Sequence, residues 1–250
     1  MNSKNLQSNS LESHSLSTGS FGYSATGLED LGATEYTLVT IVVDTSGSVA
    51  SFKKDMEKAI MEVVNSCKYS KRSDNLMIRF VTFHNDLTEE HGFKLLSDCD
   101  PSNYDDCLMV GGSTALFDAS QNSIEATRDY GKKLVDNDFD VNGIIFIITD
   151  GDDNSSVMTA DGVKKSLAEA LRSESLESLM TILIGVGVGG YPGIQKYLND
   201  FQKDAGLTQY VNIKDADEKS LAKLAQFISK SISSQSNALG SGANSQPLTF

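Results

Sequence analysis

Side chains that carry oxygen gather at three places in the sequence. Residues 44–48 read Asp-Thr-Ser-Gly-Ser, residues 111–118 read Gly-Gly-Ser-Thr-Ala-Leu-Phe-Asp, and residues 149–154 read Thr-Asp-Gly-Asp-Asp-Asn. These segments contain carboxylates and hydroxyls but neither histidine nor cysteine. Oxygen ligands of this kind select hard cations such as Mg²⁺, Mn²⁺ or Ca²⁺ over Zn²⁺. The first chemistry that the sequence suggests is therefore the binding of a hard divalent cation.

The spacing of Asp44, Ser46 and Ser48 allows three oxygens to point toward one ion. They stand at alternate positions of a short loop, and Gly47 between the two serines lets the backbone turn tightly. A site built from several hydroxyls and one or two carboxylates leaves a divalent cation incompletely neutralised. Such an ion still seeks a negative oxygen, and an Asp or Glu side chain of a partner protein would supply it.

The composition suits one domain of ordinary size with some chain left over for tails. The chain has 250 residues, 39% of them hydrophobic, and its net charge is −13. A surface this acidic repels phosphate backbones and anionic lipid head groups, so we expect neither a nucleic acid nor a membrane as partner. It favours cations and basic ligands instead.

The cysteines favour a reducing compartment. Cys67, Cys99 and Cys107 are too few and too scattered for a disulfide framework. Cys67 ends an apolar helical stripe and is expected to be a buried thiol. The first residues lack the apolar core of an export signal, and no apolar run reaches the roughly 20 residues of a membrane span. Together these features predict a cytoplasmic protein.

Apolar runs alternate with amphipathic segments along the middle of the chain, which predicts alternating strands and helices. The strands are expected at residues 36–43, 76–83, 93–96, 144–149, 180–186 and 209–213. The helices are expected at residues 52–67, 116–135, 161–172, 193–203 and 217–231. Near-continuous Val, Ile and Leu runs indicate strands buried on both faces. We therefore predict an α/β fold with a doubly wound, Rossmann-like, mostly parallel six-stranded sheet, helices on both faces and one antiparallel edge strand near Phe93.

The ends of these strands would position the polar segments. Asp44 follows the first strand, Asp150 follows the fourth, and Thr114 lies between them after a glycine turn. In open sheets of this kind, ligands bind beyond the carboxyl ends of the strands. A doubly wound sheet would therefore bring all three segments together at one edge.

Both ends of the chain are expected to be flexible tails. Residues 1–33 and 233–250 are rich in Ser, Asn and Gly and show no sustained periodicity. Neither segment carries enough apolar side chains to offset the entropy lost on ordering. The sequence therefore predicts a single domain over residues 34–232.

Three motifs occur in a fixed order, each beside a predicted strand or helix. They are Asp-x-Ser-x-Ser at residues 44–48, Gly-Gly-Ser-Thr-Ala-Leu at residues 111–116, and Ile-Thr-Asp-Gly at residues 148–151. In combination they resemble the von Willebrand factor A family over roughly residues 35–231. By that resemblance, the five positions of the family's metal-ion-dependent adhesion site are all matched, by Asp44, Ser46, Ser48, Thr114 and Asp150. The resemblance implies a bound Mg²⁺, with Mn²⁺ or Ca²⁺ as alternatives, and a partner carboxylate that completes the coordination.

These residues and the resemblance predict a divalent-metal-dependent protein-binding module of the adhesion or scaffold type. An enzyme is not expected, because no general base stands beside a nucleophile and because His84 and His91 lack zinc-site spacing. The alternative is a metal-dependent hydrolase or phosphatase that uses Asp44 at the same metal site. That chemistry usually needs a second carboxylate where this chain has Ser46. The plainest interpretation is that these Asp and Ser residues only cap helices.

Several neighbouring residues have structural interpretations. Asp152 and Asp153 are expected to be solvated loop residues, and Asp118 is expected to fix the Thr114 loop by hydrogen bonding. The glycines of residues 185–190 faintly resemble a dinucleotide loop, but no helix opens on them. We expect a strand that ends in a glycine turn.

Overall fold

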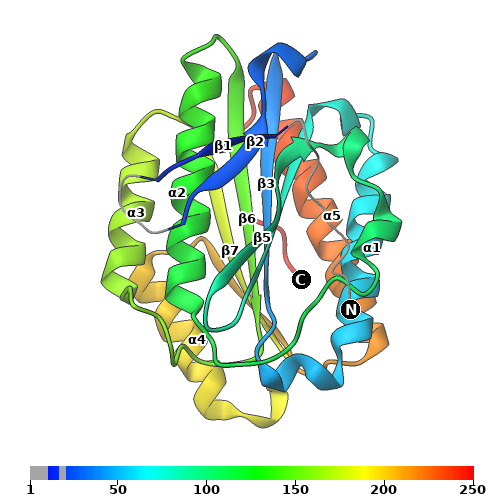
Figure 1. Ribbon diagram of the computed structural model, residues 1–250, viewed down its shortest axis with the longest axis vertical. Helices are drawn as coiled ribbons and strands as arrows, with labels where there is room; N and C mark the ends of the chain where they lie inside the picture. Colours follow the sequence, from blue (N-terminus) through cyan, green and yellow to red (C-terminus); the bar gives the residue numbers. More distant parts are fainter. Residues whose placement is uncertain (1–10, 17–20) are drawn as a thin grey trace.

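The computed structural model describes residues 11–16 and 21–250, which form one eight-stranded sheet flanked by helices (Figure 1). The strand order is β1-β2-β5-β4-β3-β6-β7-β8. The strands are β1 (Leu11–His14), β2 (Tyr23–Thr26), β3 (Glu35–Asp44), β4 (Leu76–Phe83), β5 (Leu87–Leu95), β6 (Asp140–Thr149), β7 (Leu179–Val186) and β8 (Gln209–Ile213). The main helices are α1 (Lys53–Lys68), α2 (Leu116–Val135), α3 (Ala160–Arg172), α4 (Pro192–Ala205) and α5 (Glu218–Ser241). The α/β class predicted from the sequence is confirmed.

The sheet is doubly wound about β3. This strand pairs in parallel with β4 on one side and with β6 on the other, and β7 and β8 continue the parallel order beyond β6. The chain thus builds outward from β3 in one direction and later crosses back to build in the other. At such a switch point the loops leave the two strand ends in opposite directions and open a crevice for a ligand. Asp44 ends β3, and Asp150 directly follows β6.

Helices α1 and α5 cover one face of the sheet, and α2, α3 and α4 cover the other (Figure 1). Neighbouring residues of β3 show both faces, because Val43 packs with α1 and α5 whereas Val42 packs with α2, α3 and α4. Both side chains are fully buried. The central strands are therefore apolar on both faces, which explains their near-continuous apolar runs.

The sheet contains the six predicted strands and two more, so the predicted strand count is wrong. β2 pairs in parallel with β5 at Ala25 and Phe93, and β1 lies outside β2. β5 is antiparallel to β4, as predicted, but it is not an edge strand. Tyr23 and Ala25 are both buried in β2, yet four residues are too few to show a period in the sequence. Residues 1–10 and 17–20 of the predicted N-terminal tail lie outside the described residues.

The carboxyl-terminal end also differs from the prediction. Helix α5 passes the expected domain boundary at residue 232 and continues to Ser241. Gln235 donates its side-chain amide to the carbonyl of Gly143 at 3.0 Å, and the Phe250 ring packs edge-on against an aromatic ring of α5. The buried positions here are largely Ser, Gln and Ala, and hydrogen bonds and small size allow their burial. For that reason no apolar stripe marks them in the sequence.

The helix predictions otherwise agree with the structure. Helix α2 spans the predicted residues 116–135, and the other four begin within one residue of their predicted starts. Cys67, Cys99 and Cys107 are all buried and free, which confirms the expected buried thiol. In the part of the chain that the structure describes, no helix is both long and apolar enough to cross a membrane.

Candidate metal centre

Backbone hydrogen bonds tie the first two polar segments together. The N–H of Gly47 donates to the carbonyl of Gly112 at 3.3 Å, and the N–H of Gly111 donates to the carbonyl of Thr45 at 2.8 Å. Gly112 has φ +77°, in the left-handed region that glycine adopts without strain. The loop after β3 and the loop before α2 are therefore held edge to edge, as the doubly wound topology predicts.

Asp44 is the buried end of β3. Its side chain accepts from the backbone N–H of Ser46 at 2.7 Å and from the hydroxyl of Thr149 at 2.6 Å. Burial raises the pKa of Asp44 to about 6, and these hydrogen bonds oppose that shift. Keeping this carboxylate ionised therefore costs desolvation free energy.

Ser46, Ser48 and Asp150 form a chain of oxygens across the two strand ends. The hydroxyls of Ser46 and Ser48 lie 3.2 Å apart, and Ser48 donates to the carboxylate of Asp150 at 2.8 Å. Burial raises the pKa of Asp150 as well. This contact joins the loop after β3 to the loop after β6, two segments far apart in the sequence.

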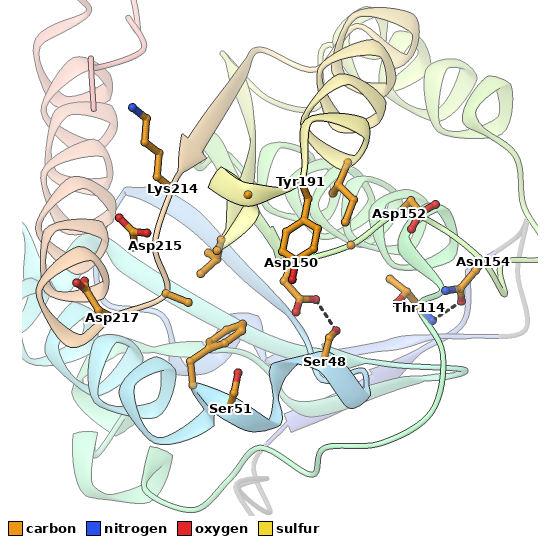
Figure 2. A pocket seen from close by; sticks show the side chains of 17 residues that line it. Ser48, Ser51, Thr114, Asp150, Asp152, Asn154, Tyr191, Lys214, Asp215 and Asp217 are labelled. Atoms are coloured by element: carbon orange, nitrogen blue, oxygen red, sulfur yellow. Dashed lines mark hydrogen bonds between the residues drawn. The ribbon is translucent and has the colours of Figure 1, made fainter.

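Thr114 joins the group from the start of α2. Its backbone N–H donates to the side-chain oxygen of Asn154 at 2.8 Å, and the N–H of Asn154 donates back to the carbonyl of Thr114 at 3.0 Å. Thr114 lines the same pocket as Ser48 and Asp150, with a cavity volume of about 880 Å³ (Figure 2). The structure therefore brings all three predicted segments to one edge of the sheet.

The donor set suits a hard cation. The five residues offer two carboxylates and three hydroxyls, and no basic side chain in the described residues supports either carboxylate, whereas the charge of Asp150 opposes that of Asp44. Negative oxygens that share a site and lack a protein cation are stabilised by a bound metal. Within the described residues, no three His, Cys, Asp or Glu side chains gather to hold a metal. Any ion here would therefore depend on the hydroxyl oxygens too.

Asp118 does not have the role predicted from the sequence. Its carboxylate accepts from the backbone N–H groups of Val157 and Met158, at 3.1 and 2.7 Å, and so fixes the loop after β6 instead of the Thr114 loop. Asp153 is not simply solvated either, because it accepts from the N–H of Phe117 at 3.2 Å. Asp118 and Asp153 therefore hold the start of α2 and the loop after β6 together.

Two residues that the sequence analysis did not assign shape the site. Thr149 donates its hydroxyl to Asp44, and Asn154 holds the backbone of Thr114. Both stand in the same polar segment as Asp150, which is the only signal in the sequence that could have pointed to them. Which of the polar residues in that segment face the other candidate ligands and which face the neighbouring loop depends on the path of the loop.

The remaining candidates agree with their structural interpretations. His91 is buried and hydrogen-bonded to the hydroxyl of Tyr104 at 2.7 Å. The strand β7 ends before Gly187, which has φ +71° and begins a turn, as predicted. Neither feature belongs to the five candidate ligands.

No protein-family model matches the chain, and no curated protein matches it. Solved structures do resemble it. The minor pilin PilB from Streptococcus sanguinis gives a TM-score of 0.56 at 15% identity over 85% of this chain and 64% of the pilin. A point mutant of the same pilin gives 0.60 at 13% identity over 86% of this chain and 65% of the pilin.

Two further solved structures also resemble this chain. Proximal thread matrix protein 1 from the mussel byssus, with a zinc-occupied MIDAS motif, gives a TM-score of 0.54 at 18% identity over 80% of this chain and 46% of that protein. The pilus adhesin SpaC from Lactobacillus rhamnosus GG, in an open conformation, gives 0.55 at 10% identity over 81% of this chain and 30% of the adhesin. This chain thus spans less than two thirds of each of these proteins, and it shares their fold.

Proposed function

We propose that this chain is a divalent-metal-dependent protein-binding module of the von Willebrand factor A type. A Mg²⁺-type ion is held by Asp44, Ser46, Ser48, Thr114 and Asp150. A carboxylate from an Asp or Glu of a partner protein completes its coordination. The observation that carries the proposal is the hydrogen bond from Ser48 to Asp150, which joins two strand ends at the switch point of the sheet.

The charge balance of the site supports a binding role. Two carboxylates cannot neutralise a divalent cation fully once each is shared with hydrogen-bond donors, as Asp44 is with Ser46 and Thr149. A cation in this setting attracts a further anionic oxygen. The hydroxyl and carboxylate that lie together here, Ser48 and Asp150, are both proposed ligands of the ion, so the chemistry that we propose for the ion is docking of an acidic side chain.

Two of the structurally similar proteins support an adhesion-type role for this chain. The byssus protein has a MIDAS motif that holds zinc, and SpaC is a pilus adhesin. Both share the fold of this chain at low sequence identity, and an adhesion-type site on such a fold agrees with the five matched positions. The partner of this chain is proposed from the chemistry of its own site.

Metal binding is the first test. Mn²⁺ replaces Mg²⁺ at oxygen sites and is measured directly by the loss of its free electron paramagnetic resonance signal. We expect one Mn²⁺ per wild-type chain. The variant Asp44→Asn keeps the size of the side chain and removes its charge, and we expect it to bind at least about 10-fold more weakly, since even indirect partners of a metal site contribute that much.

A matched control is available two residues beyond Asp150. Asp152 is an exposed acid that lines the same pocket but is not a proposed ligand. We expect Asp152→Asn to bind Mn²⁺ within about twofold of wild type, because an exposed charge is screened by solvent. Equal weakening by both variants would reduce the site to a general acidic patch, and the proposal would fail.

Partner binding is the second test. Affinity purification with wild-type protein in Mg²⁺, wild-type protein in EDTA, and Asp44→Asn in Mg²⁺ should recover a partner only in the first case. A partner recovered equally in all three would show that binding uses another surface. The acidic residues of that partner are then changed to their amides one at a time. We expect one of these changes to abolish binding.

A further inference from the structure

Three of the proposed metal ligands, Ser48, Thr114 and Asp150, line a pocket that extends well beyond them. It continues from Asp150 to the segments that follow β7 and β8, where Tyr191, Asp215 and Asp217 line it. Figure 2 shows Thr114 and Asn154 at one end of the pocket and Asp215 and Asp217 at the other, with Asp150 and Tyr191 between them. At about 880 Å³ the cavity is in the upper part of the roughly 300–1,000 Å³ range of ligand pockets. One coordinated carboxylate fills only a small part of it.

The groove is lined in part by apolar side chains. Phe52, Val186 and Ile194 line it, and Tyr191 stands over it with 61% of its surface exposed. In Figure 2 the Tyr191 ring points toward the Asp150 side chain. An exposed aromatic side chain beside a partly apolar groove is the usual anchor point of a protein interface, because it buries a large area at a small cost in conformational entropy.

The far end of the groove is negatively charged. Asp215 and Asp217 line it together with a single basic residue, Lys214, and Asp152 adds a further carboxylate near the metal end. Asp215 is exposed, so its charge faces solvent and any ligand. Anionic ligands such as phosphates would be repelled here, whereas a Lys or Arg side chain would be attracted.

Two more exposed apolar residues lie in loops at the same edge of the sheet. Met109 is 61% exposed and stands just before the loop that Gly111 ties to Thr45. Val157 is 87% exposed, and its backbone is bound by Asp118 at the start of α2. Exposed apolar side chains around a polar site are typical of a surface that another protein covers.

We infer that this groove binds an extended segment of a partner protein in which an acidic residue lies within a few positions of an aromatic or aliphatic residue and of a basic residue. The inference rests on the proposed function, since the acidic residue is the one that docks on the metal. The apolar residue packs against Tyr191 and Ile194, and the basic residue faces Asp215. The metal thus supplies the attachment, and the groove selects among acidic segments.

A peptide library tests the inference directly. The library holds one fixed Asp flanked by three randomised positions on each side, displayed on phage and selected against wild-type protein in Mg²⁺. We expect enrichment of Phe, Tyr, Leu or Ile together with Lys or Arg. One selected peptide is then labelled with fluorescein, and its affinity for each variant is measured by fluorescence anisotropy.

The variants separate the groove from the metal. Tyr191→Ser should bind the selected peptide about 10-fold more weakly, as truncation of an interface anchor does. Asp215→Asn should weaken it about threefold and reduce the dependence of affinity on salt. Tyr69→Ser and Asp74→Asn, which change an exposed tyrosine and an exposed aspartate outside the groove, should have no effect. All four variants should bind Mn²⁺ as wild type does.

The outcomes distinguish the two proposals. If wild-type protein binds no Mn²⁺, or if EDTA leaves peptide binding unchanged, the proposed function fails. If Mn²⁺ and acidic peptides bind in a metal-dependent way, but selection shows no apolar or basic preference and Tyr191→Ser binds within twofold, only the groove inference fails. Self-association of wild-type protein in sedimentation, abolished by Tyr191→Ser, would assign the groove to a second copy of the chain and would also overturn it.

Discussion

Charged side chains are buried in several regions of this molecule, and two of these regions balance the charge in opposite ways. Arg79 in β4 is 1% exposed and bonds the carboxylate of Glu89 at 2.6 Å and the side chain of Asn122 at 3.0 Å. Asp44 at the end of β3 is also 1% exposed, but its hydrogen-bond donors belong to Ser46 and Thr149, which carry no charge. Taking either charge out of water is costly. Of these two, only Arg79 has an oppositely charged partner within residues 11–16 and 21–250.

This difference indicates that the Arg79 cluster stabilises the fold, whereas the Asp44 cluster is suited to binding. Glu89 also accepts from the N–H and the hydroxyl of Ser24, at 2.8 and 2.7 Å, so the Arg79 cluster fastens the N-terminal strand β2 to the sheet. Arg79 and Glu89 balance each other's charge without an outside group. The Asp44 cluster lies at the open edge of the sheet, with Asp150 as its charged neighbour and with no basic partner among the described residues. A cation from solution would complete it.

Breaking the Arg79 cluster should have the largest effect. Arg79→Met leaves Glu89 without its cation, and we expect a loss of about 3–5 kcal/mol in the free energy of unfolding. Urea denaturation followed by circular dichroism measures this loss, which should be the same in Mg²⁺ and in EDTA. The control Lys132→Met removes an exposed ion pair with Asp136 and should cost less than about 1 kcal/mol. A similar small loss for Arg79→Met would show that the buried pair does not hold β2.

Completing the Asp44 cluster should have the next largest effect. Mg²⁺ at 100 times its dissociation constant should raise the free energy of unfolding by about 2.7 kcal/mol, because it binds the folded chain alone. Thermal denaturation with Mg²⁺ and with EDTA measures this gain, and Asp44→Asn should abolish it. In EDTA this variant should be at least as stable as wild type, since a buried charge has been removed. A large loss of stability in EDTA would instead make Asp44 structural, like Arg79.

A third buried group, His91, should respond to pH independently of metal. Burial lowers the pKa of His91 to about 3, well below the usual 6.5 of a histidine side chain. As pH falls below 6.5, the unfolded chain binds a proton at His91 that the folded chain does not bind. The contribution of His91 to the free energy of unfolding is therefore full above pH 6.5 and is lost as pH falls toward 3. Between pH 6.5 and 5 we expect wild type to lose about 1.5 kcal/mol more than His91→Gln. Equal losses in urea denaturation would contradict the buried neutral state.

The smallest effect should come from a residue that only positions a ligand. Asn154→Ala removes the acceptor for the Thr114 N–H, and we expect the affinity for Mn²⁺ to fall about 5- to 10-fold. The electron paramagnetic resonance titration described above measures it. Asn137→Ala, two residues beyond the carboxyl-terminal end of α2, is the matched control and should leave metal affinity unchanged. Unchanged affinity in Asn154→Ala as well would mean that the loop holds Thr114 without this contact.

Particular elements show what could be predicted. Helix α2 matches its predicted bounds because its apolar positions recur at helical spacing, and the central strands were recognisable because both faces are buried. Strand β2 and the end of α5 were missed because their buried residues are few, small or polar and are held by contacts such as Ser24 to Glu89 and Gln235 to Gly143. Those contacts join residues far apart in the sequence, so no local pattern reports them.

By itself the sequence determined the alternation of strands and helices and the placement of Asp44, Thr114 and Asp150 beside their ends, because apolar periodicity and chain order are local properties. Only the tertiary structure decided that Asn154 positions Thr114, that Asp118 serves a different loop, and that the pocket continues to Tyr191 and beyond. The path of a loop depends on hydrogen bonds that close only after the sheet has formed. The groove exists because loops from several strand ends meet at one edge.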